Sequence, residues 1–428
     1  MPLTRIEAHN FKSFRDLDVT LGSLNVLIGA NASGKSNFVQ LLRFVRDIAN
    51  FGLDNAVSIQ GGNNYITNLT IGQKEPIEIA VEFYDPQLSG DYSSLMSVSP
   101  SKASIDGTLK EVSYRFRLGV ITDDNYDIVA DDLLIHRTLI ERSQEGGRPK
   151  LIGDSPLFYS ASKGYLHYRS QPISEMTREQ SDPSIWKIAK GKADALIVPI
   201  KGLLLENLPG HSLLLPNLRT DIITKLPIYD FNTKLPKQTA QITGKVDLEE
   251  DGSNLVIALK NILEDEDKRR EFSSLLHDVL PFAESVDVQR LADRFLHFRL
   301  RESYSGDQYL PASLLSDGTI HVIALLVALF FSDKPLIVIE EPERNIHPYL
   351  LARVAGLLKD ASRNKQIIVT THNPEIVKNV ALDDLLFVSR DREGFSTIRR
   401  PAESADVRVF LENEIGIDEL FARNLLGA

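Results

Sequence analysis

An eight-residue glycine-rich segment, Gly29 to Ser36, constrains this chain more than any other feature. Its sequence, GANASGKS, has the required residue at every fixed position of the pattern G-x-x-x-x-G-K-[ST]. It follows the apolar run Leu24–Ile28 and leads into residues 34–48, whose apolar side chains recur at helical spacing. A strand, a glycine-rich loop and a helix in this order present backbone N–H groups and the positive end of a helix to a polyphosphate. The segment therefore predicts a phosphate-binding loop.

The residue types within the loop have distinct expected roles. The lysine, Lys35, is long enough to reach the β and γ oxygens of a polyphosphate, and the hydroxyl of Ser36 is a ligand for Mg²⁺. The predicted phosphate-binding set is Gly29, Asn31, Ser33, Gly34, Lys35, Ser36 and Asn37.

Two later apolar runs end in residues that suit phosphate chemistry. Residues 336–339 lead into Glu340 and Glu341, and residues 367–370 are followed by His372. In an open α/β sheet, ligands lie beyond the carboxyl ends of the strands. We assign Glu340 to Mg²⁺ and Glu341 to the attacking water, with His372 in reach of a γ-phosphate. The alternatives are a solvated acidic turn and a histidine that only caps or packs.

A fourth segment, Ser316-Asp317-Gly318-Thr319, precedes an apolar helix expected over residues 317–331. Ser316 or Asp317 can act simply as the N-cap of that helix. The same residues also present a hydroxyl, a glycine backbone and a positive helix end to an anion. Both interpretations stay open.

The remaining pattern divides the chain into three predicted parts. Residues 1–140 hold the phosphate loop and alternating segments such as 77–84, which predict antiparallel strands. Residues 141–280 contain recurrent prolines, and we interpret them as a loop-rich insertion with short helices. Residues 281–428 alternate helices and short apolar strands, the pattern of a parallel sheet with crossover helices.

The order of these motifs resembles the ABC-type ATPase heads of the SMC/RecF class, and more closely the AAA-family ATPases related to the OLD proteins. The opening residues 5–14, the phosphate loop, the Ser316 segment, the Glu340 segment and Thr371-His372 correspond in order to motifs of those heads. The resemblance covers about residues 1–85 and 250–390. It implies a P-loop NTPase fold of the ABC type: a mixed parallel sheet, an antiparallel β lobe and an inserted helical, loop-rich segment.

The resemblance also implies the ligands and the site. ATP with Mg²⁺ would be sandwiched between two protomers of a homodimer or higher oligomer, with Ser316 and Gly318 acting in trans. Lys35, Glu341 and His372 would be catalytic, and Mg²⁺ would be held by Ser36, Glu340 and the Q-loop candidate Gln73. Glu340 stands where many SMC relatives have aspartate. The 56 residues after His372 are too few for the TOPRIM nuclease domain of OLD proteins.

Composition narrows the remaining possibilities. The chain has no cysteine, which excludes disulfides and thiolate metal sites. Its longest apolar run, Val322–Phe331, is ten residues, so we expect a cytoplasmic protein without a membrane partner. With 48 basic against 59 acidic residues, nucleic-acid binding would need a local basic patch. The arginines at 290, 294, 299 and 301 either form such a patch or pair with carboxylates.

The function predicted from the sequence is a hydrolysing, nucleotide-driven switch. In the first hypothesis, an ATPase in a DNA-associated or anti-phage defence process regulates a separately encoded effector, a nuclease or a toxin. In the second, a slow-hydrolysing sensor or scaffold sequesters that partner. A transporter subunit is disfavoured, because Ser-Asp-Gly-Thr replaces the transporter Ser-Gly-Gly-Gln.

Overall fold

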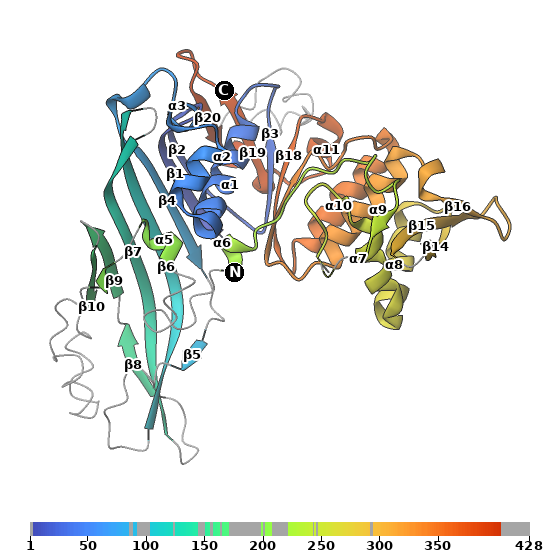
Figure 1. Ribbon diagram of the computed structural model, residues 1–428, viewed down its shortest axis with the longest axis horizontal. Coiled ribbons are helices and arrows are strands. Elements are labelled where there is room, and N and C mark those ends of the chain that lie inside the picture. The colour runs from blue at the N-terminus through green and yellow to red at the C-terminus, as the bar shows by residue number, and fades with distance from the viewer. Residues whose placement is uncertain are drawn as a thin grey trace. The chain divides into compact units, whose positions relative to one another are not determined.

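The chain forms two compact units in the computed structural model (Figure 1). Unit 1 comprises Met1–Leu21, Asn37–Lys225 and Arg390–Ile398, and unit 2 comprises Gly22–Ser36, Leu226–Ser389 and Arg399–Ala428. The structure describes residues 3–84, 89–91, 103–122, 125–143, 150–154, 157–162, 165–170, 198–199, 202–207, 221–242, 244, 247–291 and 294–403.

Unit 1 is built on an antiparallel sheet with the strand order β11-β10-β9-β7-β6-β4-β1-β2. The short strands β5 and β8 pair with β6 and β7. This sheet confirms the antiparallel lobe expected from the alternating segments. Its strands are β1 (Leu3–Phe11), β2 (Phe14–Thr20), β4 (Ile77–Tyr84), β5 (Ser89–Asp91), β6 (Ala103–Thr122), β7 (Asn125–Ser143), β8 (Lys150–Asp154), β9 (Leu157–Ser162), β10 (Tyr165–Ser170) and β11 (Val198–Pro199).

The helices of unit 1 are short, except for α1. An aromatic contact joins α1 to the sheet, because the rings of Phe44 and of Phe11 on β1 lie 5.8 Å apart. Both side chains are fully buried, and they lie on the apolar face of the sheet. The helices are α1 (Lys35–Phe51), whose first two residues belong to unit 2, α2 (Leu53–Ile59), α3 (Asn63–Ile66), η1 (Gly72–Lys74), α5 (Leu204–Asn207) and α6 (Asp221–Thr224).

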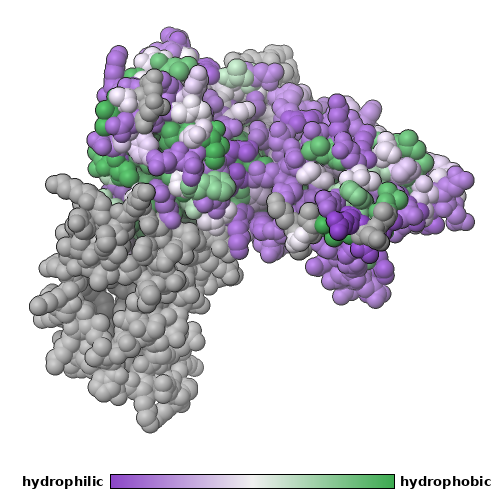
Figure 2. Space-filling model, in the orientation of Figure 1, coloured by the Kyte–Doolittle hydropathy of each residue, from purple (hydrophilic) through white to green (hydrophobic). Residues whose placement is uncertain are grey.

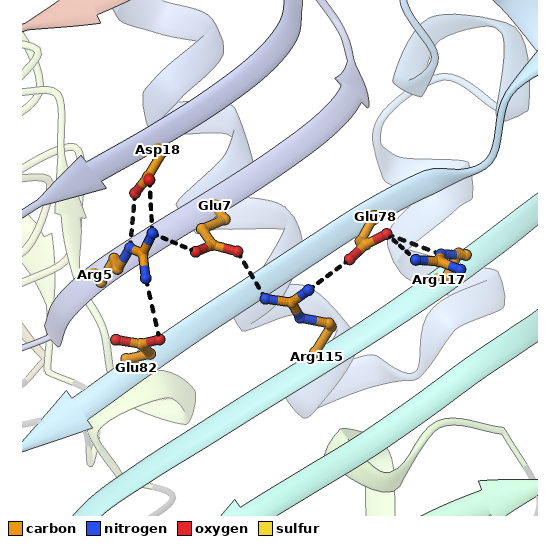
Figure 3. Close-up of polar contacts among 7 residues, drawn as sticks. All are labelled: Arg5, Glu7, Asp18, Glu78, Glu82, Arg115 and Arg117. Atoms are coloured by element: carbon orange, nitrogen blue, oxygen red, sulfur yellow. Dashed lines mark hydrogen bonds and ion pairs between the residues drawn. The ribbon is translucent and has the colours of Figure 1, made fainter.

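The other face of β1, β2, β4 and β6 carries a ladder of ion pairs (Figure 3). Arg115 bridges Glu7 at 2.8 Å and Glu78 at 2.9 Å. Arg5 and Arg117 extend the ladder to either side through Asp18 and Glu78. Opposite charges on neighbouring strands stabilise a solvated sheet face, although each exposed pair contributes only about 0 to 1 kcal/mol. The guanidinium groups of Arg5, Arg115 and Arg117 therefore pair with carboxylates of the same sheet face.

Unit 2 is built on a parallel sheet with the order β12-β17-β18-β3-β19. Its strands are buried on both faces, which explains why they read as continuous apolar runs. The parallel arrangement confirms the prediction for the C-terminal third. The strands are β3 (Leu24–Ile28), β12 (Ile228–Tyr229), β17 (Leu336–Glu340), β18 (Gln366–Thr371) and β19 (Leu385–Arg390), after which β20 (Ser396–Arg399) follows along the chain.

One face of this sheet forms a single apolar core with the helices of unit 2. Helix α9 is buried on all sides from Thr319 to Leu329, as its uninterrupted apolar sequence predicts. The helices are α7 (Leu255–Glu264), α8 (Glu266–Val279), α9 (Asp317–Phe330), α10 (Leu351–Ala361) and α11 (Pro374–Lys378), with 3₁₀ turns η4 (Ala312–Leu314), η5 (Pro348–Leu350), η6 (Leu382–Asp384) and η7 (Pro401–Glu403).

A second, smaller antiparallel sheet belongs to unit 2. Strands β14 (Ala283–Leu291) and β15 (Phe295–Glu302) form its hairpin, and β13 (Ala240–Gln241) and β16 (Tyr309–Pro311) pair with β15. Helix α8 buries Phe272, Leu276 and Val279 and turns a hydrophilic surface outwards, visible in Figure 2.

The predicted insertion, residues 141–280, contains more regular structure than its prolines suggested. The boundary at residue 140 lies inside β7, and β8, β9 and β10 follow within residues 150–170. Within residues 150–170 the sequence contains a single proline, Pro156, so most of the prolines that indicated loops lie elsewhere along the segment. Residues 171–197 and 208–220 of the segment lie outside the described residues. The three-part division along the chain remains a prediction.

A buried carboxylate lies within unit 1. Asp131 on β7 accepts hydrogen bonds from the Tyr114 hydroxyl at 2.8 Å and from the Leu204 backbone N–H at 2.6 Å. Only 1% of Asp131 is exposed, and this burial raises its pKa from 3.8 to about 7. Between these two pKa values the folded protein holds a proton that the unfolded chain has released. The contribution of Asp131 to the free energy of unfolding therefore falls as the pH rises through this interval.

Replacing Asp131 by asparagine, which cannot titrate, should remove this pH dependence. We expect the free energy of unfolding of Asp131→Asn, relative to the wild type, to rise by about 2 kcal/mol between pH 5 and pH 7. Urea unfolding at both pH values measures the difference. A difference that is constant or falls with pH would contradict this account of Asp131.

Candidate functional site

The phosphate loop connects β3 to α1 and depends on tight backbone contacts. A Cβ atom on Gly29 would lie 2.2 Å from the Val388 carbonyl oxygen, so only glycine fits at the end of β3. Gly34 has a φ of +123°, which a residue with a side chain adopts only under strain. Both fixed glycines of the motif are therefore required by the local backbone.

Lys35 lies at the start of α1 with its ammonium group folded over the loop. Its Nζ donates to the carbonyl oxygens of Gly29 at 2.7 Å and Ala30 at 3.0 Å. Burial lowers the pKa of Lys35, while nearby Glu341 and Glu343 act in the opposite direction. Phosphate oxygens in the loop would give the same ammonium anionic partners.

The parallel register places Glu340 and Glu341 beside this loop. Glu340 pairs with Thr370 on β18, which pairs in turn with Leu27 on β3. The next residue, Glu341, donates its backbone N–H to the Thr370 carbonyl at 2.9 Å and has a φ of +47°. A non-glycine residue in this region is strained, and such strain clusters at functional sites.

His372 completes the cluster from the end of β18. Its Nδ1 lies 3.3 Å from Glu341 Oε1. Beneath it, buried Glu343 accepts a hydrogen bond from Thr371 Oγ1 at 2.6 Å. The structure thus brings Lys35, Glu341 and His372 to one edge of the sheet of unit 2, and burial raises the pKa of Glu343.

One charged group of the site, Arg344, was not predicted from the sequence. Arg344 directs Nε and Nη2 at Glu341 Oε2, at 3.2 and 3.1 Å, and donates from Nη1 to Asp230 at 2.6 Å. Arg344 stands three residues after Glu341, a spacing that is typical of an ion pair within one turn. The second partner, Asp230, lies 114 residues away in the sequence and gave no signal.

The Ser316 segment forms the start of α9. The Ser316 hydroxyl accepts from the Thr319 backbone N–H at 3.1 Å, which confirms the N-cap interpretation. A Cβ on Gly318 would lie 2.5 Å from the Asn345 carbonyl oxygen, so this glycine is needed for packing within the protomer. Asp317 forms an ion pair with Lys237 at 2.5 Å. These observations leave the role in trans as a prediction.

The other predicted binding residues are spread over both units. Asn31 and Ser36 are exposed in unit 2, where Ser33 is buried. Asn37 belongs to unit 1 and donates to Ser13 at 2.6 Å. Gln73 also belongs to unit 1, in the turn η1, where its amide donates to Asn64. Its role as a Q-loop ligand remains a prediction.

The oxygen ligands of unit 2 fit Mg²⁺ in the manner of phosphate-loop sites. The described residues contain no cluster of three or more histidine or acidic side chains able to hold a metal by themselves. Mg²⁺ bound with a nucleotide needs only one or two protein oxygens, because phosphate and water supply the rest. The Ser36 hydroxyl and the Glu340 carboxylate are oxygens of this kind.

Two of the four arginines considered for a nucleic-acid groove are paired with carboxylates. Arg299 contacts Asp287 at 2.7 Å, and Arg301 contacts Glu284 at 3.1 Å. The pairing alternative is therefore confirmed for these two. Arg290 and Arg294 are exposed at the end of the β14–β15 hairpin. Within the described part of the chain, no helix is long and apolar enough to cross a bilayer.

The parallel sheet, the phosphate loop and the carboxylates at the end of β17 define a P-loop protein of the AAA ATPase class. A sequence family described as "AAA domain, putative AbiEii toxin, Type IV TA system" matches residues 24–378. Because this match covers most of the chain, the protein belongs to that family.

Curated relatives match over shorter segments. The chromosome partition protein Smc of Thermoplasma acidophilum is 34% identical over 155 residues, which are 33% of this chain and 13% of that protein. The Septu protein PtuA of Bacillus thuringiensis is 30% identical over 90 residues, 20% of this chain and 23% of PtuA. The protein ea59 of Escherichia phage lambda is 34% identical over 83 residues, 19% of this chain and 15% of ea59. The chain thus matches less than a quarter of the length of each of these relatives.

Solved structures similar to the chain include SMC head domains. The head domain from Thermotoga maritima is 15% identical with a TM-score of 0.42, over 94% of this chain and 99% of that chain. A head domain from Pyrococcus furiosus, bound to the C-terminal domain of ScpA, is 15% identical with a TM-score of 0.43, over 96% of this chain and 98% of that chain.

The contact between Gly318 and Asn345 predicts that a side chain at position 318 destabilises the protein even when no nucleotide is bound. Gly318→Ala should lower the free energy of unfolding of the nucleotide-free protein by about 1 to 3 kcal/mol, because its Cβ would overlap a backbone carbonyl. As a control, Gly356→Ala on α10 meets open space and should be neutral or stabilise by up to about 1 kcal/mol. Thermal unfolding compares the two. Unchanged stability of Gly318→Ala would show that this glycine is not needed for packing.

Proposed function

We propose that this protein binds and hydrolyses ATP and acts as a nucleotide-driven switch on a separately encoded effector. The observation that carries the proposal is the convergence of Lys35, Glu341 and His372 at one sheet edge, with Glu341 and His372 3.3 Å apart. A cation, a carboxylate and an imidazole in one place can bind a γ-phosphate and orient a water beside it. Few other reactions use this set next to a phosphate loop.

Each residue has a role that follows from its place in the site. The backbone of residues 29–34 surrounds the phosphates, and Lys35 neutralises their charge. Mg²⁺, held by Ser36 and Glu340, supplies further neutralisation of the triphosphate when it is bound. Glu341 orients the attacking water, and His372 contacts the γ-phosphate from the neighbouring strand. The protein contributes positioning and electrostatics to a phosphoryl transfer.

The exposure of the Ser316 segment supports the proposal that the protein assembles with a second copy of itself. Ser316 is exposed at the N-terminus of a 14-residue helix, where it would be accessible to a nucleotide on another protomer. ATP would then be sandwiched between two protomers, and hydrolysis would release them. The engaged pair would be the active form of the switch.

The comparisons support a role in defence, which we propose is directed against phage. The family description names a putative toxin of a toxin–antitoxin system, and PtuA is a Septu protein. We propose that the effector is a nuclease or a toxin encoded separately and controlled by the ATP-bound assembly. Any association with DNA would come from that effector or from the process in which the effector acts.

One observation favours the alternative of a slow-hydrolysing scaffold. Arg344 occupies one oxygen of Glu341, and His372 faces the other. A carboxylate engaged in this way is a poor partner for water. The protein would then hold ATP for long periods and sequester its toxin or nuclease through assembly itself.

Replacing Glu341 separates binding from hydrolysis. Glu341→Gln should keep ATP binding and lower kcat by about 10² to 10⁴, because the amide cannot act as a base. Lys35→Ala should weaken ATP binding by about 10- to 100-fold through loss of a charged hydrogen bond. Phosphate release and equilibrium binding of a fluorescent ATP analogue measure these effects.

Exposed Glu264 on α7 provides the matched control for these substitutions. Glu264→Gln removes an exposed carboxylate that pairs with Lys260 on the same helix and should change neither quantity. A wild-type rate that is negligible and insensitive to Glu341→Gln would favour the scaffold. Full turnover by Glu341→Gln would overturn the catalytic assignment.

ATP should also change the oligomeric state. Light scattering of Glu341→Gln with ATP and Mg²⁺ should show a doubled mass, because bound nucleotide is not consumed. Ser316→Arg should prevent this by filling the nucleotide-facing end of α9. Ser274→Arg, at an exposed position on α8, should dimerise like the parent. Equal dimerisation by both arginine variants would contradict the sandwich arrangement.

A further inference from the structure

Arg344 lies between two carboxylates that differ in function. Its Nε and Nη2 face Glu341 Oε2 at 3.2 and 3.1 Å, and its Nη1 donates to Asp230 Oδ1 at 2.6 Å. Asp230 directly follows the edge strand β12 and is outside the phosphate-binding set. The guanidinium therefore bridges the predicted water-orienting group and a carboxylate with no role in phosphate binding.

Each carboxylate oxygen of Glu341 faces another side chain, although 33% of the Glu341 side chain is exposed. Oε2 accepts the Arg344 fork, and Oε1 lies 3.3 Å from His372 Nδ1. A carboxylate must accept a hydrogen bond from water to orient it, and the fork of an arginine competes for the same lone pairs. Glu341 is thus held in an arrangement that disfavours its predicted task.

The turn that holds Arg344 is strained at both ends. Glu341 has a φ of +47° and Asn345 a φ of +63°, and neither is a glycine. The turn is closed by a hydrogen bond of 3.0 Å from Arg344 N–H to the Glu341 carbonyl. Strain of this kind persists where the surrounding structure holds it in place, and it clusters at active sites and switch regions. The Asn345 carbonyl lies against Gly318 on the first turn of α9, and Asn345 is the residue next to Arg344 in the chain. A displacement of α9 would therefore move Arg344 through its direct neighbour.

We propose that Arg344 is a positioning residue that restrains Glu341, and that Asp230 is its alternative partner during hydrolysis. When Arg344 pairs with Asp230 alone, it keeps a counter-charge while Glu341 Oε2 becomes available to water. The role of Arg344 presupposes the ATP hydrolysis proposed above. In this proposal Arg344 slows ATP hydrolysis, because Glu341 must leave Arg344 before it can orient the attacking water.

The test uses two substitutions with opposite expected effects. Arg344→Gln removes the restraint and should raise kcat by about three- to tenfold with little change in KM for ATP. Asp230→Asn removes the alternative partner, strengthens the hold on Glu341 and should lower kcat. The double variant should behave like Arg344→Gln. Arg363→Gln, which removes an exposed arginine paired three residues back with Asp360 on α10, is the control.

A second readout needs no nucleotide. A double-mutant cycle of Arg344→Gln and Glu341→Gln on urea unfolding should give a favourable coupling between the two side chains in the free protein. If both single variants at 344 and 230 change kcat in the same direction, or if the coupling is absent, the restraint does not exist. If neither the wild type nor any variant turns over ATP, the proposed function fails, and the restraint fails with it.

Discussion

The register between three parallel strands is the constraint on which the site depends. Glu340 pairs with Thr370, and Thr370 with Leu27, so the strands that lead into the phosphate loop, the carboxylates and the histidine end at the same level. Parallel strands β3, β18 and β17 are buried on both faces, and a slip by one residue would move apolar side chains out of register with the core. The energy that fixes the core thus also fixes the spacing of the polar residues beyond it.

The strained turn after β17 carries the groups through which we propose that Glu341 is restrained. Glu341 follows the strand directly and has a left-handed backbone. Four residues later, Asn345 lies against Gly318 at the start of α9. Glu343, two residues on, is buried and tied to Thr371 at the end of β18. One end of the turn is therefore held by the sheet, and the other contacts the Ser316 segment. The second protomer proposed at α9 would have a short physical route to Glu341 through this turn.

Local patterns predicted the parts of the site that depend on local physics. The glycines of the phosphate loop and the apolar strand before Glu340 each impose a conformation or a burial pattern that the sequence shows directly. The N-cap at Ser316 is of the same kind. Arg344 was missed because its bridge to Asp230 exists only after β12 has joined the edge of the sheet. The strands within residues 150–170 were missed because the prolines that recur over residues 141–280 dominated the interpretation of the whole segment.

The most direct test of the account is an experimental structure of Glu341→Gln with ATP and Mg²⁺. We expect the γ-phosphate to lie within hydrogen-bonding distance of Lys35 Nζ and His372. Mg²⁺ should lie on Ser36 and Glu340, and Ser316 of a second copy should contact the same nucleotide. A nucleotide bound away from the carboxyl edge of β3, β18 and β17 would contradict this expectation.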